Sequence, residues 1–245
     1  MIYLSGFHAI EERIKSGLPC GPLLIAKPGP RARGIMALAL QKKIKVNRVG
    51  TADLERLSAD HRGILLEIDE KLKENDPEIN LEAFMEELGD RKDVLAIILD
   101  EITDPHNYGA ILRSCDQFGA DIVITRKRRI AKHADVISKT SSGASSWVPT
   151  AETANLARAI EILKEGGFWI YGADMEGEKL WTKDLRGRTA IIMGGEGSGI
   201  SRILKESCDA LIAIPSKGRL DSLNVSVAAG VLFYEVMRQR NLGHR

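Results

Sequence analysis

From Val94 onward, short apolar runs alternate with segments of helical periodicity, and this alternation constrains the fold more than any other feature. Continuous Val, Ile and Leu runs are typical of parallel strands buried on both faces, with helices as the crossovers. The sequence therefore predicts an α/β domain with a mainly parallel sheet covered on both faces by helices. Strands are expected at residues 94–99, 122–125, 168–173, 190–193 and 211–214, and helices at 108–118, 156–165, 201–207 and 223–240.

The first 70 residues read as a separate, smaller α/β unit. Between Glu70 and Asp93 the composition shifts toward Glu, Lys and Asp, and one short amphipathic helix is expected around residues 81–88. We therefore predict a small domain at 1–70, a linker at 71–92 and a larger domain at 93–245. Within the small domain, helices are expected at 8–15 and 35–42, and strands at 23–26, 45–49 and 64–68.

Composition excludes several classes of protein. No apolar run approaches the ~18 residues of a membrane span and no signal-peptide pattern opens the chain, so a cytoplasmic protein without membrane contact is expected. Cys20, Cys115 and Cys208 lie far apart without a C-x-x-C pair, which predicts neither a disulfide framework nor a metal site. The net charge of +1 hides basic clusters at 42–48 and 126–132, each either a phosphate-binding patch or a solvated face.

Residues 211–231 join a buried strand to a polar loop and a helix of small residues. Pro215 ends the strand, because proline cannot donate to a central ladder. At the start of the helix, Ser222, Asn224 and Ser226 alternate with apolar residues. Ligands of open parallel sheets bind beyond the carboxyl ends of the strands. These side chains therefore form either a binding site or an ordinary helix cap, because Ser and Asn are common N-cap residues.

A second polar segment follows the strand at 94–99. Asp104 and Pro105 predict a turn, and Asn107 is expected to cap the next helix. Gly109 lies one helical turn before Arg113, so the two share a helix face. The missing side chain leaves room beside the guanidinium for a phosphate or ribose; the alternative is a surface arginine and a tolerated glycine.

The third segment is a glycine loop at residues 194–201, GGEGSGIS. Its spacing fits neither the dinucleotide fingerprint nor a P-loop, since Ile200 stands where the P-loop lysine is needed. A nucleotide hydrolase is therefore disfavoured. The glycines let a ligand approach the backbone, and Glu196 within the loop favours a cationic ligand or ribose hydroxyls over an anion.

These three segments, residues 104–113 (DPHNYGAILR), 193–199 (MGGEGSG) and 214–228 (ending SLNVSVA), resemble the motifs of the SpoU family of RNA 2′-O-methyltransferases. The resemblance implies a knotted, SPOUT-type methyltransferase domain, a homodimer and S-adenosylmethionine as cofactor. Residues 6–9 (GFHA) and 61–63 (HRG) resemble the small RNA-binding domain of the branch that methylates a guanosine of 23S rRNA. The tRNA ribose remains an alternative substrate, and a catalytically silent RNA-binding protein an alternative function.

The resemblance also assigns site residues. It implies cofactor binding by backbone groups around Gly194, Ile214 and Leu223. The sequence departs from the family pattern at Tyr108, Gly195 and Trp147, where Leu, Ala or Asn, and a polar residue are more usual. The polar positions of the family's site correspond to Asn107, Arg113, Glu196, Ser222 and Asn224.

The resemblance implies that Arg113 is the general base, but an arginine pKa above about 12 makes its neutral form scarce at neutral pH. We expect Arg113 instead to grip the neighbouring phosphate and orient the hydroxyl. Ser222 and Asn224 are expected to position the methionine end and the ribose. Glu196 is expected to hold its loop by accepting backbone N–H bonds.

Overall fold

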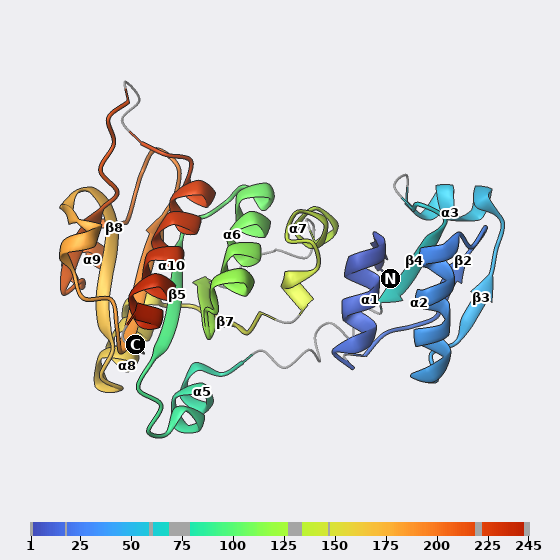
Figure 1. Cartoon of the computed structure of the whole chain (residues 1–245), viewed down its shortest axis with the longest axis horizontal. Coiled ribbons are helices and arrows are strands. Elements are labelled where there is room, and N and C mark those ends of the chain that lie inside the picture. Colours follow the sequence, from blue (N-terminus) through green and yellow to red (C-terminus); the bar gives the residue numbers. More distant parts are fainter. Residues whose placement is uncertain are drawn as a thin grey trace. The chain divides into compact units, whose positions relative to one another are not determined.

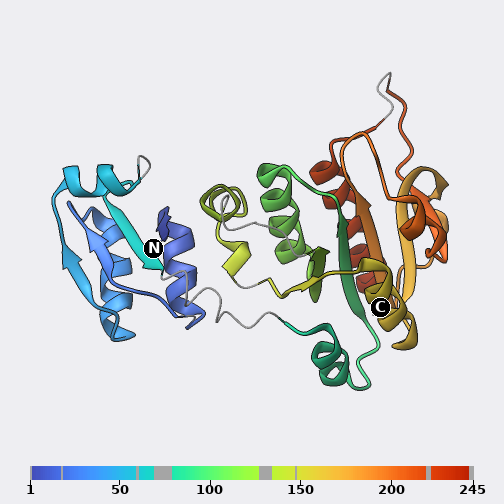
Figure 2. The same cartoon turned by 180° about the vertical axis from the view of Figure 1, so that it is seen from behind.

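The computed structural model describes residues 2–17, 19–58, 61–68, 79–126, 134–146, 148–218 and 222–242. Contacts between residues divide the chain into two compact units. One unit comprises Met1–Pro77 and Ile130–Trp147, and the other comprises Glu78–Arg129 and Val148–Arg245. Figure 1 labels their elements, and Figure 2 shows the same elements from behind.

A six-stranded sheet forms the centre of the larger unit, and all its strand pairs are parallel, as predicted. The strand order is β10-β8-β9-β5-β6-β7. The short strand β7 was not predicted, because Thr-Ala-Glu-Thr has no apolar run. The strands are β5 (Val94–Asp100), β6 (Ile122–Arg126), β7 (Thr150–Thr153), β8 (Trp169–Lys179), β9 (Arg188–Gly194) and β10 (Ala210–Ala213).

Helices cover both faces of this sheet. Figures 1 and 2 show α8 (Leu156–Glu165) on one face and α10 (Val225–Leu242) on the other. α10 packs against α6 (Pro105–Phe118) and also contacts β9. α5 (Leu81–Leu88) and α9 (Arg202–Glu206) both contact α8. Because both faces are covered, every residue of the central strand β5 is buried.

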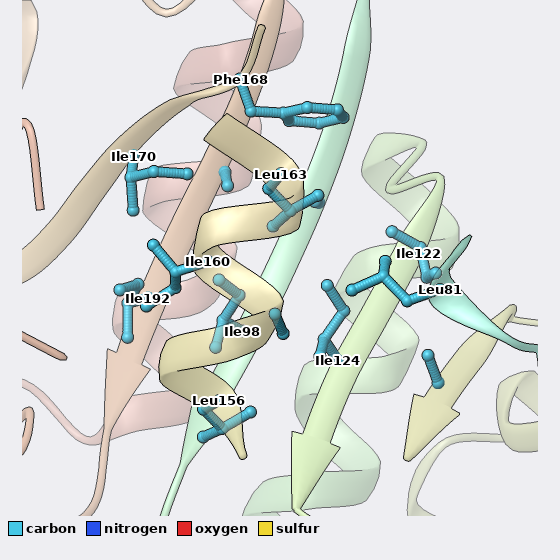
Figure 3. Close-up of a cluster of buried hydrophobic side chains, with 14 of the residues drawn as sticks. Leu81, Ile98, Ile122, Ile124, Leu156, Ile160, Leu163, Phe168, Ile170 and Ile192 are labelled. Carbon is cyan, nitrogen blue, oxygen red and sulfur yellow. The ribbon is translucent and has the colours of Figure 1, made fainter. Parts of the chain in front are cut away.

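One apolar layer lies between α8 and the sheet (Figure 3). Leu156, Ile160 and Leu163 recur at the spacing of one helix face and are at most 1% exposed. They meet strand residues such as Ile98 and Ile192, which share a sheet face because side chains alternate along a strand. Burying each such side chain contributes roughly 1.5–3 kcal/mol. This layer therefore fixes the strand ends that carry the polar segments.

The smaller unit has a four-stranded sheet in the order β1-β4-β2-β3. Its strands are β1 (Ile2–Ser5), β2 (Leu23–Ile25), β3 (Val46–Arg48) and β4 (Ile64–Ile68), and its helices include α1 (Phe7–Lys15), α2 (Pro30–Gln41) and α3 (Thr51–Leu57). β1 and α3 were not predicted. α7 (Ala134–Thr140) contacts β1, and the 3-10 helix η2 (Ala144–Ser146) contacts α1, so both belong to this unit.

Some predicted features lie outside the described residues, namely Trp147 and all of the second basic cluster except Arg126. Within the described ranges, every helix falls short of the length and apolarity that a membrane span requires. The division into 1–70, 71–92 and 93–245 stays a prediction.

Candidate functional site

Three segments far apart in the sequence meet at the carboxyl edge of the parallel sheet. Asn107 lies in the first turn of α6, after β5. Glu196 lies in the loop after β9, and Asn224 immediately precedes α10. β5 and β9 are hydrogen-bonded neighbours in parallel register, so their carboxyl ends lie side by side. The topology therefore brings the predicted polar motifs to one place.

The side chains of these residues form one hydrogen-bonded cluster. Asn107 Nδ2 donates to Glu196 Oε1 at 2.6 Å. Asn224 Nδ2 donates to the same oxygen at 2.9 Å and to Asn107 Oδ1 at 3.0 Å. Glu196 Oε2 accepts no hydrogen bond from the described residues, so the carboxylate keeps one oxygen for another donor.

Asn107 does not cap α6, so that prediction was wrong. Asp104 is the N-cap, because its Oδ1 accepts the His106 N–H at 3.0 Å, and Pro105 occupies the first helical position. Asn107 therefore lies inside the helix, where its side chain is free of the capping role. It is only 7% exposed and reaches the neighbouring loop.

Asn224 confirms the helix-cap interpretation, while its part in a binding site stays a prediction. Its Oδ1 accepts the backbone N–H of Ser226 at 2.9 Å and that of Val227 at 3.4 Å, as in an N-cap. Ser226 Oγ also donates to this oxygen at 2.6 Å. Because the oxygen serves the helix, the amide nitrogen is oriented toward Glu196 and Asn107.

Glu196 does not hold its loop as predicted. Its recorded hydrogen bonds come from the side-chain amides of Asn107 and Asn224, and none comes from a backbone N–H of the described residues. The expected role was wrong because both amides lie within reach of the same carboxylate oxygen. Glu196 thus links the glycine loop to α6 and to the start of α10.

Backbone contacts shape the glycine loop. A Cβ at Gly194 would lie 2.1 Å from the Gly199 carbonyl carbon, and one at Gly195 would lie 2.7 Å from the Glu101 carbonyl oxygen. Gly197 and Gly199 have φ values of 81° and 64°, which favour glycine. The loop closes on itself through the Gly199 N–H, which donates to Gly195 O at 3.0 Å. The departure at Gly195 therefore has a steric reason in this chain.

The donor set fits S-adenosylmethionine. This ligand carries a cationic sulfonium and ribose hydroxyls, which a carboxylate with a free oxygen and a loop of exposed backbone groups can accommodate. Ile214 is partly buried, and the Leu223 side chain is 45% exposed beside Asn224. No group of His, Cys, Asp and Glu suited to a metal ion occurs in the described part of the chain.

The structure does not bring every predicted site residue into this cluster. Arg113 is exposed on α6, and Ser222 is exposed before α10. Within the described ranges, neither side chain takes part in the hydrogen bonds among Asn107, Glu196 and Asn224. Arg113 is thus exposed to solvent, and its contact with a phosphate stays a prediction.

Tyr108, a departure from the family pattern, and Asp100, which follows β5's apolar run, are both buried. Tyr108 is 7% exposed, and burial raises the pKa of its hydroxyl, so it is a neutral core residue. Asp100, which the sequence analysis missed, is completely buried at the end of β5. The signal for it was available, because it is the single acidic residue closing an otherwise apolar strand.

Comparison with known proteins identifies both parts of the chain. Residues 94–234 match the SpoU rRNA Methylase family, and residues 3–73 match a family described as RNA 2′-O ribose methyltransferase substrate binding. A 23S rRNA (guanosine-2′-O-)-methyltransferase, RlmB, from Neisseria meningitidis is 39% identical over 246 residues, covering 97% of this chain and 95% of the relative. A Borreliella burgdorferi protein named as an uncharacterized tRNA/rRNA methyltransferase is 39% identical over 223 residues, covering 88% and 97%.

Solved structures agree. The SpoU methyltransferase AviRb from Streptomyces viridochromogenes, in complex with AdoMet, superposes with a TM-score of 0.79 at 23% identity, covering 98% of this chain and 91% of that one. An RNA 2′-O ribose methyltransferase structure gives 0.79 at 25% identity, covering 98% and 88%. The predicted fold class, a knotted SPOUT-type domain preceded by a small α/β domain, is confirmed. Since the family match spans more than half of the sequence, the chain belongs to the SpoU rRNA methylase family.

Proposed function

We propose that this protein transfers the methyl group of S-adenosylmethionine to a ribose 2′-hydroxyl of RNA, and that the substrate is a guanosine of 23S rRNA. The observation that carries the proposal is the hydrogen-bonded cluster of Asn107, Glu196 and Asn224. It joins one residue from each of the three motif segments. The name of the Neisseria meningitidis relative supports the guanosine substrate.

Backbone groups around Gly194, Ile214 and Leu223 would hold S-adenosylmethionine, which supplies an electrophilic methyl group when bound. Glu196 keeps one oxygen for a donor of this ligand or of the ribose. Asn107 and Asn224 fix that carboxylate, so it does not reorganise when substrate binds. In this proposal Ser222, next to Leu223, helps to position the ribose.

Arg113 orients the nucleophile in this proposal. Its guanidinium is exposed and forms no bond within the cluster, which leaves it available to the phosphate next to the target ribose. A guanidinium is not deprotonated in proteins, so Arg113 holds its charge rather than removing the proton. Methyl transfer requires the hydroxyl oxygen at about 3–3.5 Å from the methyl carbon and in line with the bond that breaks.

A homodimer is part of the proposal. Val227, Val231 and Tyr234 lie on one face of α10 and are 53%, 39% and 50% exposed. The Tyr234 ring packs edge-on against Phe118 of α6, with centroids 6.0 Å apart, which extends the apolar face. Apolar stripes of this kind are typical of interaction surfaces. We assign this face to a second copy of the chain.

The proposal assigns RNA binding to residues 1–70. The linker at 71–92 joins them to the catalytic domain at 93–245. The reaction occurs in the cytoplasm. The first unit offers basic side chains on described elements, such as Arg48 of β3 and Arg33 of α2. Arg31 lies 5.8 Å from the ring centroid of Phe7, an aromatic-cation pair suited to nucleic-acid contact.

The test is transfer of a labelled methyl group to 23S rRNA, free or in large-subunit particles, and to tRNA, followed by mapping of the labelled ribose. Label on a guanosine ribose of 23S rRNA is expected. Label on tRNA alone would keep the chemistry and overturn the ribosomal substrate. Binding of RNA without binding of S-adenosylmethionine would instead support the silent RNA-binding protein.

A further inference from the structure

Asp100 closes β5 beside the glycine loop, and its contacts differ from those of the other sheet aspartates. It is 0% exposed, and its Oδ2 accepts the backbone N–H of Ser201 at 2.8 Å. Ser201 ends the glycine loop and is the N-cap residue of α9. One buried carboxylate oxygen thus holds the far end of the loop, 101 residues along the chain.

The next residue, Glu101, contacts the near end of the same loop. Gly195 lies so close to the Glu101 carbonyl oxygen that an added Cβ would be 2.7 Å away. Glu101 has a φ of 59°, which is uncommon for a residue with a side chain. Asp100 also pairs with Gly194 in the register of β5 and β9. Two consecutive residues therefore bracket the loop that carries Glu196.

Asp121 and Asp209 form hydrogen bonds comparable to that of Asp100, but at the amino ends of the strands. Each accepts a backbone N–H near a strand start, from Leu95 and Ile170 at 2.7 Å, with one oxygen. With the other oxygen, each bonds a cationic side chain. These two side chains are 17% and 23% exposed, and both of their oxygens have partners.

The Asp100 carboxylate is less well satisfied. Among the described residues its Oδ1 is buried without a hydrogen-bond partner, and it forms only a long ion pair with Arg126 Nη2, at 3.6 Å. The Arg126 Nε is also buried and finds no hydrogen-bond partner in the described part of the chain. An unmet buried acceptor opposes stability. Stability of the fold alone therefore does not explain a carboxylate at this position.

We infer that Asp100 is a positioning residue for methyl transfer, which holds the glycine loop through Ser201 in the geometry that S-adenosylmethionine requires. The inference rests on the proposed cofactor site. Asp100 itself touches neither substrate nor cofactor in this role. Without its acceptor, the Ser201 N–H is left unpaired and the far end of the loop loses this anchor, so the position of Gly194 relative to Glu196 is less firmly fixed.

The experiment removes each half of the Asp100–Ser201 hydrogen bond separately. Asp100→Ala removes the acceptor, whereas Ser201→Pro removes the donor at a φ of −58°, which proline tolerates. Asp100→Asn retains an oxygen that can accept the N–H. The matched control is Asp121→Ala, which loses a comparable bond and ion pair away from the glycine loop. Calorimetry gives the Kd for S-adenosylmethionine, steady-state assays give KM and kcat, and circular dichroism reports folding.

Asp100→Ala and Ser201→Pro are each expected to raise the cofactor Kd and KM roughly ten-fold, with little change in the KM for RNA. Asp100→Asn should recover part of this loss. The double variant Asp100→Ala/Ser201→Pro should bind about as weakly as the weaker single variant, since both remove one interaction. Asp121→Ala should lower the unfolding temperature with an unchanged cofactor Kd.

Wild-type cofactor affinity in the folded Asp100→Ala or Ser201→Pro variant overturns the inference, and so do additive losses of affinity in the double variant. Equal losses of cofactor affinity in Asp121→Ala would overturn it as well, because they would indicate a general effect on stability. Failure of the wild-type protein to bind S-adenosylmethionine is a different result, since it rejects the proposed function itself.

Discussion

The side-chain amide of Asn107 donates to the carboxylate of Glu196 at 2.6 Å, although 89 residues separate them. Asn107 belongs to α6 and Glu196 to the glycine loop, so this bond ties the elements after β5 and β9 together. Asn224 completes the contact from the start of α10. The cluster thus joins the three predicted motif segments through side-chain hydrogen bonds.

Replacing Asn107 with Ala should impair catalysis more than folding. The variant loses a donor to a carboxylate, an interaction worth about 1.5–3 kcal/mol, so kcat/KM should fall at least about ten-fold. Asn155→Ala is the matched control, because Asn155 caps α8 through its side chain. It should lose about 1 kcal/mol of unfolding free energy and no activity. Equal activity of the two variants would contradict a catalytic role for the cluster.

Replacing Arg113 with Lys should distinguish two-point hydrogen bonding to a phosphate from the effect of positive charge alone. Lysine retains the charge but lacks the planar fork that binds phosphate through two hydrogen bonds. We expect the KM for RNA to rise roughly ten-fold, with an unchanged Kd for S-adenosylmethionine. Near-full turnover at the wild-type KM would show that a two-point grip is unnecessary.

Two glycines should respond oppositely to alanine. Gly195→Ala places a Cβ 2.7 Å from the Glu101 carbonyl oxygen, so we expect a loss of about 1–3 kcal/mol of unfolding free energy and weaker cofactor binding. Gly34→Ala in α2 meets nothing within 4 Å and should gain about 0.5–1 kcal/mol, because alanine favours helix. Urea denaturation measures both. A stable Gly195→Ala protein with full cofactor affinity would refute the steric account.

Replacing Val231 with Asp should disrupt the proposed homodimer, because it places a charge within the exposed apolar face of α10. Analytical ultracentrifugation should give a dimer for the wild-type protein and a monomer for the variant. Leu40 of α2 is 59% exposed, so Leu40→Asp serves as the control and should leave the mass unchanged. A monomeric wild-type protein would remove this part of the proposal.

The cysteines should react slowly with thiol reagents in the folded protein. Burial raises the pKa of Cys208 to about 11, and it also raises the pKa values of Cys20 and Cys115. The thiolate is the reactive form, and at pH 8 only about one Cys208 in a thousand carries it. Labelling followed by mass spectrometry should show slow modification that becomes fast in denaturant. Rapid modification of any cysteine in the folded protein would contradict this setting.

The sequence was sufficient for the features that depend on neighbouring residues. The apolar run of β5 predicted a buried parallel strand, and the helical pattern at residues 156–165 predicted α8. Both patterns reflect local periodicity. β7 was not predicted, because it joins the sheet by pairing with β6 and has no apolar run of its own.

The sequence predicted which residues form the candidate site, but it did not predict the hydrogen bonds between them. Asn107 and Asp104 are both suitable N-cap residues, and only the position of Pro105 in the first turn decides between them. The partners of Asn107 and Glu196 are set by the sheet order, which places distant loops together. For the same reason, the bond of Asp100 to Ser201 could not be read from either segment alone.

The position of Asn224 has a consequence for when the site appears during folding. It lies 117 residues after Asn107, at the entry to the C-terminal helix, and it closes the cluster. Contacts of such long range form late, because the chain must first be ordered over the intervening segments. A nascent chain that has not yet released α10 from the ribosome can pair most of its sheet but lacks the third member of the cluster. Competence for the reaction is therefore expected only after α10 has been synthesised and has folded onto the sheet.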